Sequence, residues 1–483
     1  MNSETIKRRV SDLIARSQPY VDQTRENIQP YAEKAKGHVR PFMDEAAAQF
    51  ERSKHHCSSA LSSAQTDFHR LSQQPHFKEI AYGLILLLFV TITLARYISY
   101  RHSRTPSSRP STPTTPRLEK ATTYSSSPPS TRKPGTWPPS TFARPKPPPY
   151  ENWSIEHTKP LPYRPFRHGP KYFQTMGLRN VKWDDWIELD NHFPRFHGDK
   201  ARRITERGHK CCKTAPEAYP AAIELLEELR SYLPDRYPSL YARTDKGIKN
   251  LWSGEDLDTT SDPLPEDPMQ TAARLVQDDL AIMIERPDGQ YYLLAGAILL
   301  AGFWRLEDKY GMPLSEIHTS GDVPQYREKL EKGMMNFFRR LKPEELVARN
   351  NYFLQVDEDL AWSYSIGSED RPDISWNTAE KNRAIEHHYF RSERQTLRRL
   401  PKSGGVVFTI RTYFHPITEI AQEDYVPGRL ASAVRSWGDD VSRYKGKEKY
   451  EAVLLEYLDK KHQEQLDRGL KLEEEDEKRI YPW

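Results

Sequence analysis

The sequence predicts a mixed α+β fold, in which one large domain follows a helical N-terminal region, an apolar segment and a proline-rich linker. Three observations predict this organisation. From about residue 160 onward, helical and strand-type hydrophobic patterns alternate. Residues 80–95 contain no charged side chain. Residues 101–150 contain 13 prolines among many Ser and Thr residues, a composition typical of an unfolded tether.

The N-terminal region, residues 1–79, carries Pro–aromatic pairs at a spacing of eleven: Pro19-Tyr20, Pro30-Tyr31 and Pro41-Phe42. Eleven residues are close to three helical turns, so these pairs return to nearly the same side of a helix. Because proline fits the first turn of a helix but breaks its interior, we expect short amphipathic helices joined by kinks. Two interpretations stay open, namely helices that lie on a membrane surface and a solvated helical spacer.

The apolar segment at residues 80–100 predicts one transmembrane helix, because it is long enough to cross a lipid bilayer if Arg96 reaches the interface. A buried core helix is the alternative. Basic residues are more frequent after the segment, which puts the C-terminal domain in the cytosol by the positive-inside rule. We therefore expect a single-pass membrane protein with the bilayer as a partner. The basic residues are Arg70 and Lys78 before the uncharged stretch 80–95, and Arg96, Arg101, Arg104, Arg109, Arg117 and Lys120 after it.

The remaining chain divides into three predicted parts. Residues 101–159 are expected to form a disordered or polyproline-type linker, residues 160–440 the folded domain and residues 441–483 a charged helical tail. Apolar residues at helical spacing predict helices within the domain at 181–190, 221–233, 301–309 and 323–340. Strands are predicted at 278–284, 291–295 and 406–413, and a tight turn at 286–289 joins the first two strands into a hairpin.

Composition and motifs exclude several classes of protein. The net charge of +4 is spread over mixed acids and bases, so no nucleic-acid partner is expected. Three cysteines, Cys57, Cys211 and Cys212, form no disulfide framework, which indicates a reducing compartment. The folded region has no G-x-G-x-x-G, P-loop, H-E-x-x-H, G-x-S-x-G or C-x-x-C motif, which argues against the common nucleotide-binding, zinc-protease and hydrolase classes.

Two polar segments could carry chemistry. Asp357-Glu358-Asp359 has the D-x-D form with which metal-dependent glycosyltransferases hold a sugar nucleotide through a divalent ion, although a surface loop is the default interpretation. The second segment is rich in arginine and is expected to be helical over two turns. Guanidinium groups bind carboxylates, so this segment could clamp an acidic ligand, such as the propionates of a haem, or form surface salt bridges. Its arginines are Arg391, Arg394, Arg398 and Arg399, with Arg411 on the strand behind them.

The same arginine-rich segment carries a resemblance to a known family. ERQTLRRLP at residues 393–401, leading to VFTIRTY at 407–413, resembles the signature of the haem-dependent oxidative N-demethylase alpha-subunit-like family. Further segments are similar to the family, and together they cover roughly residues 160–425. These further segments are 176–178 (MGL), 183–190 (WDDWIELD), 233–238 (LPDRYP), 293–304 (LLAGAILLAGFW), 309–311 (KYG) and 317–318 (IH).

The resemblance implies a PAS-like antiparallel sheet domain that binds haem. By its place in the family pattern, His318 is the candidate axial ligand of the iron, whereas family members tend to continue with Pro-Val-Pro where this chain reads TSGDVP at 319–324. His387 and His388 are alternative ligands, and both are expected to be exposed. The candidates for contacts with haem or substrate are Arg394, Gln395, Thr396 and Arg411.

The resemblance also implies an activity: O₂-dependent demethylation of a small amine, with electrons from a partner reductase that carries flavin and an iron–sulfur centre. The absence of a dinucleotide-binding motif is consistent with an external electron donor. The expected protein is thus a membrane-anchored haem-binding oxidoreductase. Two other functions stay open: a membrane-bound, mannosyltransferase-like glycosyltransferase with a lumenal domain, and a non-catalytic PAS-like sensor of haem or another ligand.

Overall fold

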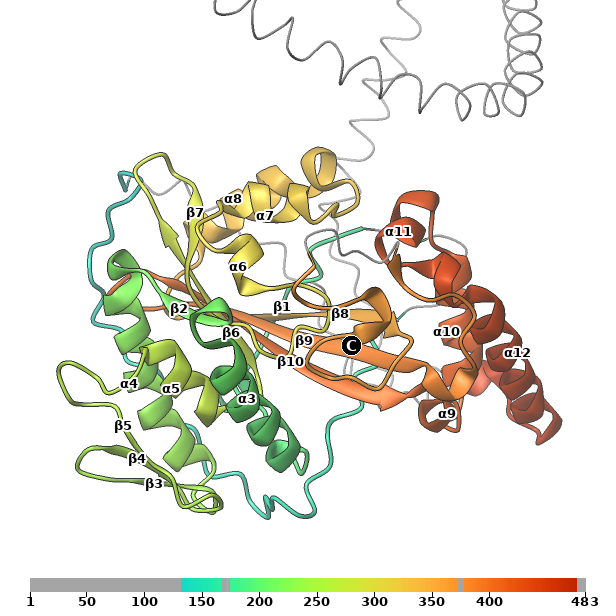
Figure 1. Cartoon of the computed structure of the whole chain (residues 1–483), viewed down its shortest axis with the longest axis horizontal. Helices are drawn as coiled ribbons and strands as arrows, with labels where there is room; N and C mark the ends of the chain where they lie inside the picture. The colour runs from blue at the N-terminus through green and yellow to red at the C-terminus, as the bar shows by residue number, and fades with distance from the viewer. Residues whose placement is uncertain (1–131, 167–171, 173, 372–377, 476–483) are drawn as a thin grey trace, which may run out of the picture. The chain divides into compact units, whose positions relative to one another are not determined.

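The structure is a computed structural model that describes residues 132–166, 172, 174–371 and 378–475 (Figure 1). All of these residues belong to one unit of the chain, Leu118–Trp483. The predicted helical region at residues 1–79, the apolar segment at 80–100 and the first part of the proline-rich linker lie outside the described residues. The predictions for these segments therefore stay without a structural counterpart.

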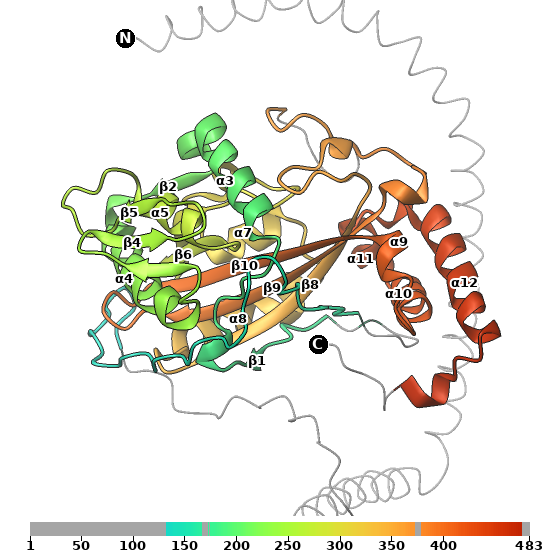
Figure 2. The ribbon, with the colours of Figure 1, turned by 90° about the horizontal axis from the view of Figure 1, so that it is seen from below.

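A seven-stranded antiparallel sheet forms the centre of the domain, with helices on both of its faces (Figures 1 and 2). The α+β class predicted from the sequence is confirmed. In spatial order the strands are β1 (Arg179–Asn180), β8 (Leu346–Gln355), β9 (Tyr389–Arg399), β10 (Val406–Pro416), β6 (Asp279–Glu285), β7 (Tyr291–Ala297) and β2 (Cys212–Thr214). A second sheet consists of β3 (Tyr241–Arg243), β4 (Gly247–Asn250) and β5 (Asp256–Asp258).

Two hairpins build most of the large sheet. The predicted hairpin is confirmed as β6 and β7, and its turn is closed by the Gly289 N–H, which donates to the Arg286 carbonyl oxygen at 2.8 Å. The predicted strand at 406–413 is confirmed as part of β10. β10 pairs with β9 along its whole length, from Val406 opposite Arg399 to Pro416 opposite Tyr389. β9 and β10 are thus paired over their full length, and both lie in the middle of the sheet.

The arginine-rich segment differs from the prediction, because it forms strand β9 and not a helix. Its arginine spacing fits helical turns, but main-chain pairing with β8 on one side and β10 on the other decides the conformation. Alternate side chains of a strand point to opposite faces of a sheet. Arg391 and Arg399 therefore lie on one face, and Arg394 and Arg398 lie on the other.

We call one side of the sheet the α7 face. On it β9 presents Arg391, Glu393, Gln395, Leu397 and Arg399. The helices between β7 and β8 cover this side, and their apolar residues pack against Leu397, Ile410 and Met283 of the sheet. These helices are α6 (Leu306–Lys309), α7 (Leu314–Ser320), the π-helix η4 (Tyr326–Leu330) and α8 (Glu331–Arg340).

We call the opposite side the α4 face, on which β9 presents Ser392, Arg394, Thr396 and Arg398. Leu225 and Leu229 of α4 pack here against Leu280, Ile282 and Val407 in the largest apolar cluster. The covering helices are α3 (Phe193–Arg207), α4 (Tyr219–Arg236) and α5 (Pro268–Leu275), and α4 contains the predicted helix at 221–233.

C-terminal helices cover the edge of the sheet where β8 ends and β9 begins. They pack there on Tyr352, Leu354 and Phe390 in a separate apolar cluster. They are α9 (Ile417–Ile420), α10 (Val426–Arg435), α11 (Asp439–Tyr444) and α12 (Glu451–Asp467). Short 3₁₀ turns connect the larger elements: η1 (Trp183–Asp185), η2 (Gly208–Lys210), η3 (Pro216–Ala218), η5 (Tyr364–Ile366), η7 (Ile385–His387), η8 (Lys447–Lys449) and η9 (Leu472–Glu474).

The helix predicted at 181–190 is wrong except for the turn η1. The carbonyl oxygens of this segment accept hydrogen bonds from side chains instead of from the amide groups of a helix. Tyr232 Oη donates to the Asp184 carbonyl oxygen at 2.8 Å, and Tyr237 Oη donates to the Ile187 carbonyl oxygen at 2.7 Å. The amphipathic spacing instead reflects Trp186 and Ile187, which insert into the core at 0% exposure.

The segment at residues 132–159 has no helix or strand of its own and lies along the domain. Trp137 Nε1 donates to the Pro401 carbonyl oxygen at 2.9 Å in the turn between β9 and β10, and Trp153 Nε1 donates to the Leu189 carbonyl oxygen at 2.8 Å. Arg144 pairs with Glu228 of α4 at 3.1 Å. The division of the chain into domains stays a prediction, but these contacts show which part of the predicted linker touches the fold.

The localisation expected from the sequence needs correction. Across the residues that the structure describes, every helix is too short or too polar to cross a lipid bilayer. The physical reason is that these helices are amphipathic and present charged side chains beside the apolar residues that they bury in the core. This finding contradicts the expected single-pass membrane protein with a cytosolic domain. The apolar segment at 80–100 itself lies outside the described residues.

The turn between β9 and β10 provides a stability test, because Gly404 has φ +75° and a Cβ there would lie 2.3 Å from the Trp137 ring. We expect Gly404→Ala to lower the free energy of unfolding by about 2–4 kcal/mol, since backbone strain and steric overlap add. Gly311 is the matched control, because it has φ +81° but open space around its Cβ position. Gly311→Ala should cost only about 1 kcal/mol. Urea unfolding of both variants measures the difference, and equal losses would contradict the packing of Trp137 on this turn.

Candidate cofactor site

His318 lies on α7 with its imidazole held from two sides. Nδ1–H donates to the carbonyl oxygen of Leu314, one turn earlier in the helix, at 2.7 Å. The ring stacks on Tyr326 of η4, with centroids 4.8 Å apart and planes at 9°. The hydrogen bond fixes the tautomer that carries its proton on Nδ1, so that Nε2 has a free lone pair. Among the described residues, no hydrogen-bond partner of Nε2 is found.

The electrostatics keep this imidazole neutral. Burial lowers the pKa of His318 below its usual range, and the positive charges of Arg349 and Lys309 lower the pKa further, against the hydrogen bond to Leu314. A neutral imidazole is the form that binds a metal ion. Burial and the neighbouring charges therefore favour the form of His318 that can bind a metal ion.

The segment after His318, where the chain departs from the family pattern, is closed by local bonds. The Val323 N–H donates to the His318 carbonyl oxygen at 3.1 Å. Gln325 adopts φ +54°, and its Nε2 donates to Asp440 of α11 at 2.7 Å. The π-helix that follows presents Tyr326 to the imidazole, and π-helical turns are frequent at functional sites. The altered sequence thus forms a tight connection that holds the Tyr326 ring against His318.

Below α7, the sheet carries a buried chain of polar groups. Arg349 Nη1 donates to Gln395 Oε1 at 3.1 Å, and Gln395 Nε2 donates to Glu393 Oε2 at 2.9 Å. Gln395 and Glu393 are 6% and 5% exposed, and Arg349 is half-buried. Burial raises the pKa of Glu393 and lowers the pKa of Arg349. A cation and a carboxylate are thus joined through one amide on the α7 face.

Lys445, directly after α11, is the third charged group of this region. Burial lowers its pKa to about 7, the charge of Glu393 opposes this shift, and the charge of Arg349 adds to it. Lys445 Nζ donates to the carbonyl oxygen of Tyr352 and to Asn351 Oδ1, the latter at 3.5 Å. No ion pair joins Lys445 to Glu393 among the contacts of the described residues. Protonated Lys445 therefore gives this region an excess of positive charge.

Three of the predicted contact residues lie on the α4 face, away from His318. Arg394 Nε pairs with Glu188 at 3.0 Å, and Arg411 Nη2 pairs with Asp190 at 2.5 Å. Thr396 and Thr409 share a hydroxyl–hydroxyl bond of 2.8 Å. Both arginines thus already have carboxylate partners within the protein. Of the five residues predicted from the sequence, the structure brings His318 and Gln395 to the same face and keeps Arg394, Thr396 and Arg411 on the other.

The other arginines of β9 also have partners. Arg398 pairs with Glu228 of α4 at 2.9 Å. On the α7 face, Arg399 donates to the Leu341 carbonyl oxygen at 2.8 Å and to Tyr291 Oη at 3.0 Å. Arg391 donates to the carbonyl oxygens of Leu360, at 3.0 Å, and Leu300. These guanidinium groups hold loops and helices against the sheet, so the arginine cluster is mainly a structural network in the interior and not a surface salt-bridge network.

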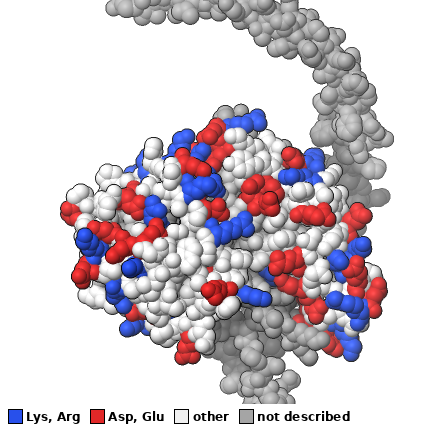
Figure 3. Space-filling model, turned by 60° about the horizontal axis from the view of Figure 1, so that its bottom comes forward, with Lys and Arg blue, Asp and Glu red and all other residues white. Residues whose placement is uncertain are grey.

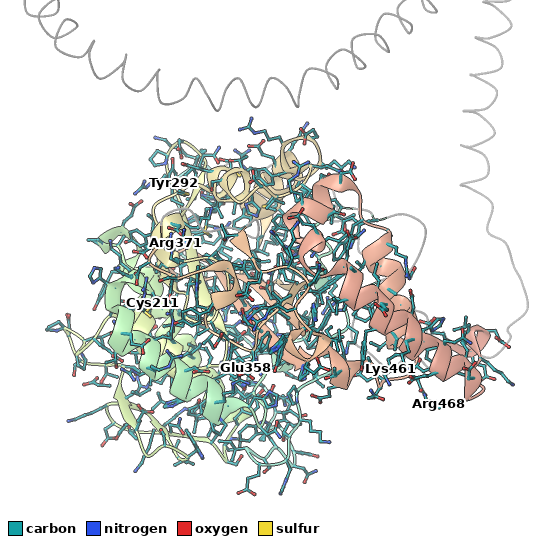
Figure 4. The ribbon with its side chains drawn as sticks, turned by 45° about the vertical axis from the view of Figure 1, so that its right-hand side comes forward. Cys211, Tyr292, Glu358, Arg371, Lys461 and Arg468 are labelled. Carbon is teal, nitrogen blue, oxygen red and sulfur yellow. The ribbon has the colours of Figure 1, made fainter. Side chains whose placement is uncertain are left out.

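The remaining candidates from the sequence do not assemble a metal site. Asp357 of the D-x-D segment turns inward and accepts hydrogen bonds from Gln355 Nε2 and Ser363 Oγ, both at 2.6 Å, whereas Glu358 is exposed (Figure 4). Within the described residues, no group of three or more His, Cys, Asp or Glu side chains could hold a metal ion. Asp357 of the D-x-D segment therefore forms hydrogen bonds within its own loop.

The cysteines and the alternative histidines have local roles. Cys211 (Figure 4) and Cys212 are free and buried. His387 is exposed as expected, but His388 is fully buried at 0% exposure, and burial lowers its pKa to about 4. His388 lies beside η7 at the end of the sheet that α9 covers, where the Ile417 N–H donates to its carbonyl oxygen at 2.8 Å.

Sequence patterns missed three residues of this region: Arg349, Glu393 and Lys445. Strand periodicity in 389–399 would have grouped Glu393 with Gln395 on one face. Arg349 gave no signal, because a single arginine in an apolar stretch has no local pattern. Lys445 lies in a charged stretch that suggests a solvated surface, and only the tertiary packing of α11 reveals its burial.

Lys445 provides a test of these electrostatics. Its pKa is about 7 in the folded protein against the usual 10.5. Between these values the unfolded chain binds more protons than the folded protein, so this group makes the free energy of unfolding rise with pH. In Lys445→Met this contribution is absent. We expect the stability of wild type relative to the variant to increase by about 1–3 kcal/mol from pH 7 to 9.

Urea unfolding at several pH values measures this difference. Lys460→Met, at an exposed position of α12, is the matched control and should show a difference from wild type that does not vary with pH. A pH-independent difference for Lys445→Met as well would show that Lys445 keeps its ordinary protonation in the folded protein.

The chain matches a known protein family. Residues 177–455, more than half of the chain, match a family model described as "Haem-dependent oxidative N-demethylase, alpha subunit-like". The match covers the whole seven-stranded sheet and α7, and it extends through α11 into α12.

Proposed function

The chain belongs to the haem-dependent oxidative N-demethylase, alpha subunit-like family, and from this membership we propose that it is a haem-binding oxidoreductase. We assign the haem to the α7 face of the sheet and His318 to the axial position, with Nε2 as the ligand atom. The residues on this side suit the group: a neutral imidazole donor, an apolar cluster and buried polar side chains. The residues on the α4 face do not, because their charges are already paired.

One observation carries the proposal: His318 has its Nδ1–H bonded to the Leu314 carbonyl oxygen at 2.7 Å. Histidines that ligate metals almost always donate their other ring N–H to a carbonyl or carboxylate, which fixes the tautomer and the ring orientation. Here the helix itself provides that acceptor, and Tyr326 restrains the ring plane.

We further propose that the domain is PAS-like. The strands from β6 to β10 lie in space as β7-β6-β10-β9-β8, so the first and last strands of the set are neighbours at the centre. The helices α6 to α8 lie in the connection between the second and the third strand of the set. Sheet order and helix placement support this fold, in which a ligand binds between the sheet and those helices.

When bound, haem would supply the chemistry of O₂ activation. The chain's own residues would shape the surroundings. Apolar side chains such as Leu314, Phe337 and Ile410 exclude water from the α7 face. Glu393, Gln395 and Arg349 provide a polar end where a substrate can be oriented and a proton exchanged. This division into a dry part and a polar part suits an oxidation in which a small amine is demethylated.

We propose a separate reductase with flavin and an iron–sulfur centre as the electron donor. The support is the sequence, which has no dinucleotide-binding G-x-G-x-x-G motif in the folded region. A small secondary amine is the proposed substrate. The signs of charge are mixed on the face shown in Figure 3, so charge alone marks no docking area there.

Haem binding is tested on the full chain, reconstituted with haem and followed by its Soret absorption. We expect one haem per chain, and His318→Ala should shift or abolish the band because the axial ligand is lost. Free imidazole should restore the band in His318→Ala by occupying the vacated position. His388→Gln is the matched control, a buried histidine on another part of the domain, and should keep the spectrum of the wild type. An unchanged band in His318→Ala would contradict the assignment.

Catalysis is tested by O₂ consumption of the haem-loaded chain with a competent reductase. A secondary amine should increase O₂ uptake and release an aldehyde in equal amount. The variant Glu393→Gln should lower this amine-dependent O₂ uptake about tenfold or more if Glu393 exchanges a proton with the substrate. Haem binding without amine-dependent uptake would instead favour a non-catalytic sensor. The glycosyltransferase alternative is not proposed, because Asp357 is turned away from solvent and bonded within its own loop.

A further inference from the structure

We propose that Arg349 on β8 is the receptor for a ligand carboxylate that binds against the α7 face of the sheet. This inference rests on the proposed haem site, because it names a group that would be held beside His318. It replaces the interpretation in which Arg394 and Arg411 bind an acidic ligand.

The acceptors separate Arg349 from the other arginines of the central strands. Arg394, Arg398 and Arg411 each have a carboxylate within 3.0 Å. Arg391 and Arg399 each bond to main-chain carbonyl oxygens. Within the part of the chain that the structure describes, Arg349 makes one hydrogen bond, to the side-chain amide of Gln395 at 3.1 Å. Among the described residues it forms no ion pair and no bond to a main-chain carbonyl oxygen. Its Nε is shielded from solvent without an acceptor, as are Nε of Arg391 and Nε and Nη2 of Arg398.

A buried guanidinium of this kind lowers the stability of the protein unless acceptors satisfy its N–H groups. A buried donor without an acceptor loses its bonds to water and gains nothing in return. Gln395 cannot supply more, because its amide nitrogen is already bound to Glu393 at 2.9 Å. The amide orientation is therefore fixed, with the carbonyl oxygen toward Arg349. One edge of the guanidinium is held in place, and the Nε side stays available for a second acceptor.

The charges around Arg349 favour an anion as that acceptor. Glu393 is the carboxylate of this group, while Arg349 and Lys445 are its cations, and the charges of Glu393 and Arg349 both act on Lys445. One further carboxylate would balance the excess cation, and a guanidinium binds a carboxylate with two parallel hydrogen bonds. Arg349 lies opposite Gln395 in the sheet, on the face that is covered by α7, the helix that carries His318.

Two molecules could bring that carboxylate. The first is the haem itself through a propionate, and the second is a small substrate that carries a carboxylate next to its amine. Both present the same group to Arg349, so the experiment must separate them. Esterified haem lacks the charge of its propionates, and N-methylglycine differs from dimethylamine by its carboxylate.

The first arm titrates the full chain with haem and with haem dimethyl ester, followed by Soret absorption. If a propionate binds Arg349, wild type should prefer haem over the ester by about tenfold or more, and Arg349→Gln should lose this preference. Arg349→Lys, which keeps the charge, should retain part of it. Arg394→Gln is the matched control: it removes a buried guanidinium from the neighbouring position on the opposite face, so the preference should remain even if stability falls.

The second arm measures the melting temperature of the same variants with N-methylglycine or dimethylamine. If the carboxylate belongs to a small ligand, N-methylglycine should raise the melting temperature of wild type and Arg394→Gln but not of Arg349→Gln, and dimethylamine should have no such effect. If Arg349→Gln behaves like wild type in both experiments, the proposal is overturned. If wild type binds neither porphyrin, the haem assignment fails, and the second arm still decides whether Arg349 binds a carboxylate.

Discussion

The burial of arginine in the two central strands is the constraint on which the rest of the domain depends. Five guanidinium groups of β9 and β10 are exposed by 2% or less. Each one needs acceptors in the interior, because a buried charge without partners would cost several kcal/mol. The surrounding segments supply these acceptors. Glu188 and Asp190 come from the irregular chain after η1, Glu228 from α4, and main-chain carbonyl oxygens from the connections after β7, α8 and β8.

This constraint explains why segments that look regular in sequence are irregular in the fold. Residues 183–190 have helical spacing, yet their carbonyl oxygens must remain free to accept from Arg394, Tyr232 and Tyr237. A helix would use those oxygens for its own amide groups. The chain therefore stays irregular after η1, and Glu188 can accept from Tyr163 Oη at 2.7 Å as well as pair with Arg394.

The two faces of the sheet consequently differ in how completely their buried charged groups are paired. On the α4 face the cations of β9 and β10 have carboxylate partners, so that side holds the helices in place. On the α7 face, Glu393, Gln395, Arg349 and Lys445 are joined by few direct bonds and lie next to a restrained neutral histidine. Uncompensated polar groups lower stability, and such groups persist at functional sites where a ligand completes them. The contrast between the faces is the basis for assigning the cofactor to the α7 side.

The sequence predicted the local features of this fold better than its long-range ones. The β6–β7 hairpin was predictable because its turn residues act locally, and α4 because its apolar spacing is regular. The strand β9 was not, since its conformation depends on pairing with β8 and β10 across long loops. His318 and Gln395 were found through the family resemblance, which does not distinguish the faces of a sheet. Arg394, Thr396 and Arg411 belong to the same signature, yet strand alternation and pairing put them on the opposite side from His318.

The central claim is that the α7 face, and not the α4 face, binds haem through His318. The most direct measurement is a crystal structure of the full chain with haem, in which anomalous scattering at the iron absorption edge locates the metal. We expect an iron peak within bonding distance of His318 Nε2, on the side of the sheet covered by α6 to α8. A peak on the α4 face, beside Arg394 and Arg411, would contradict it.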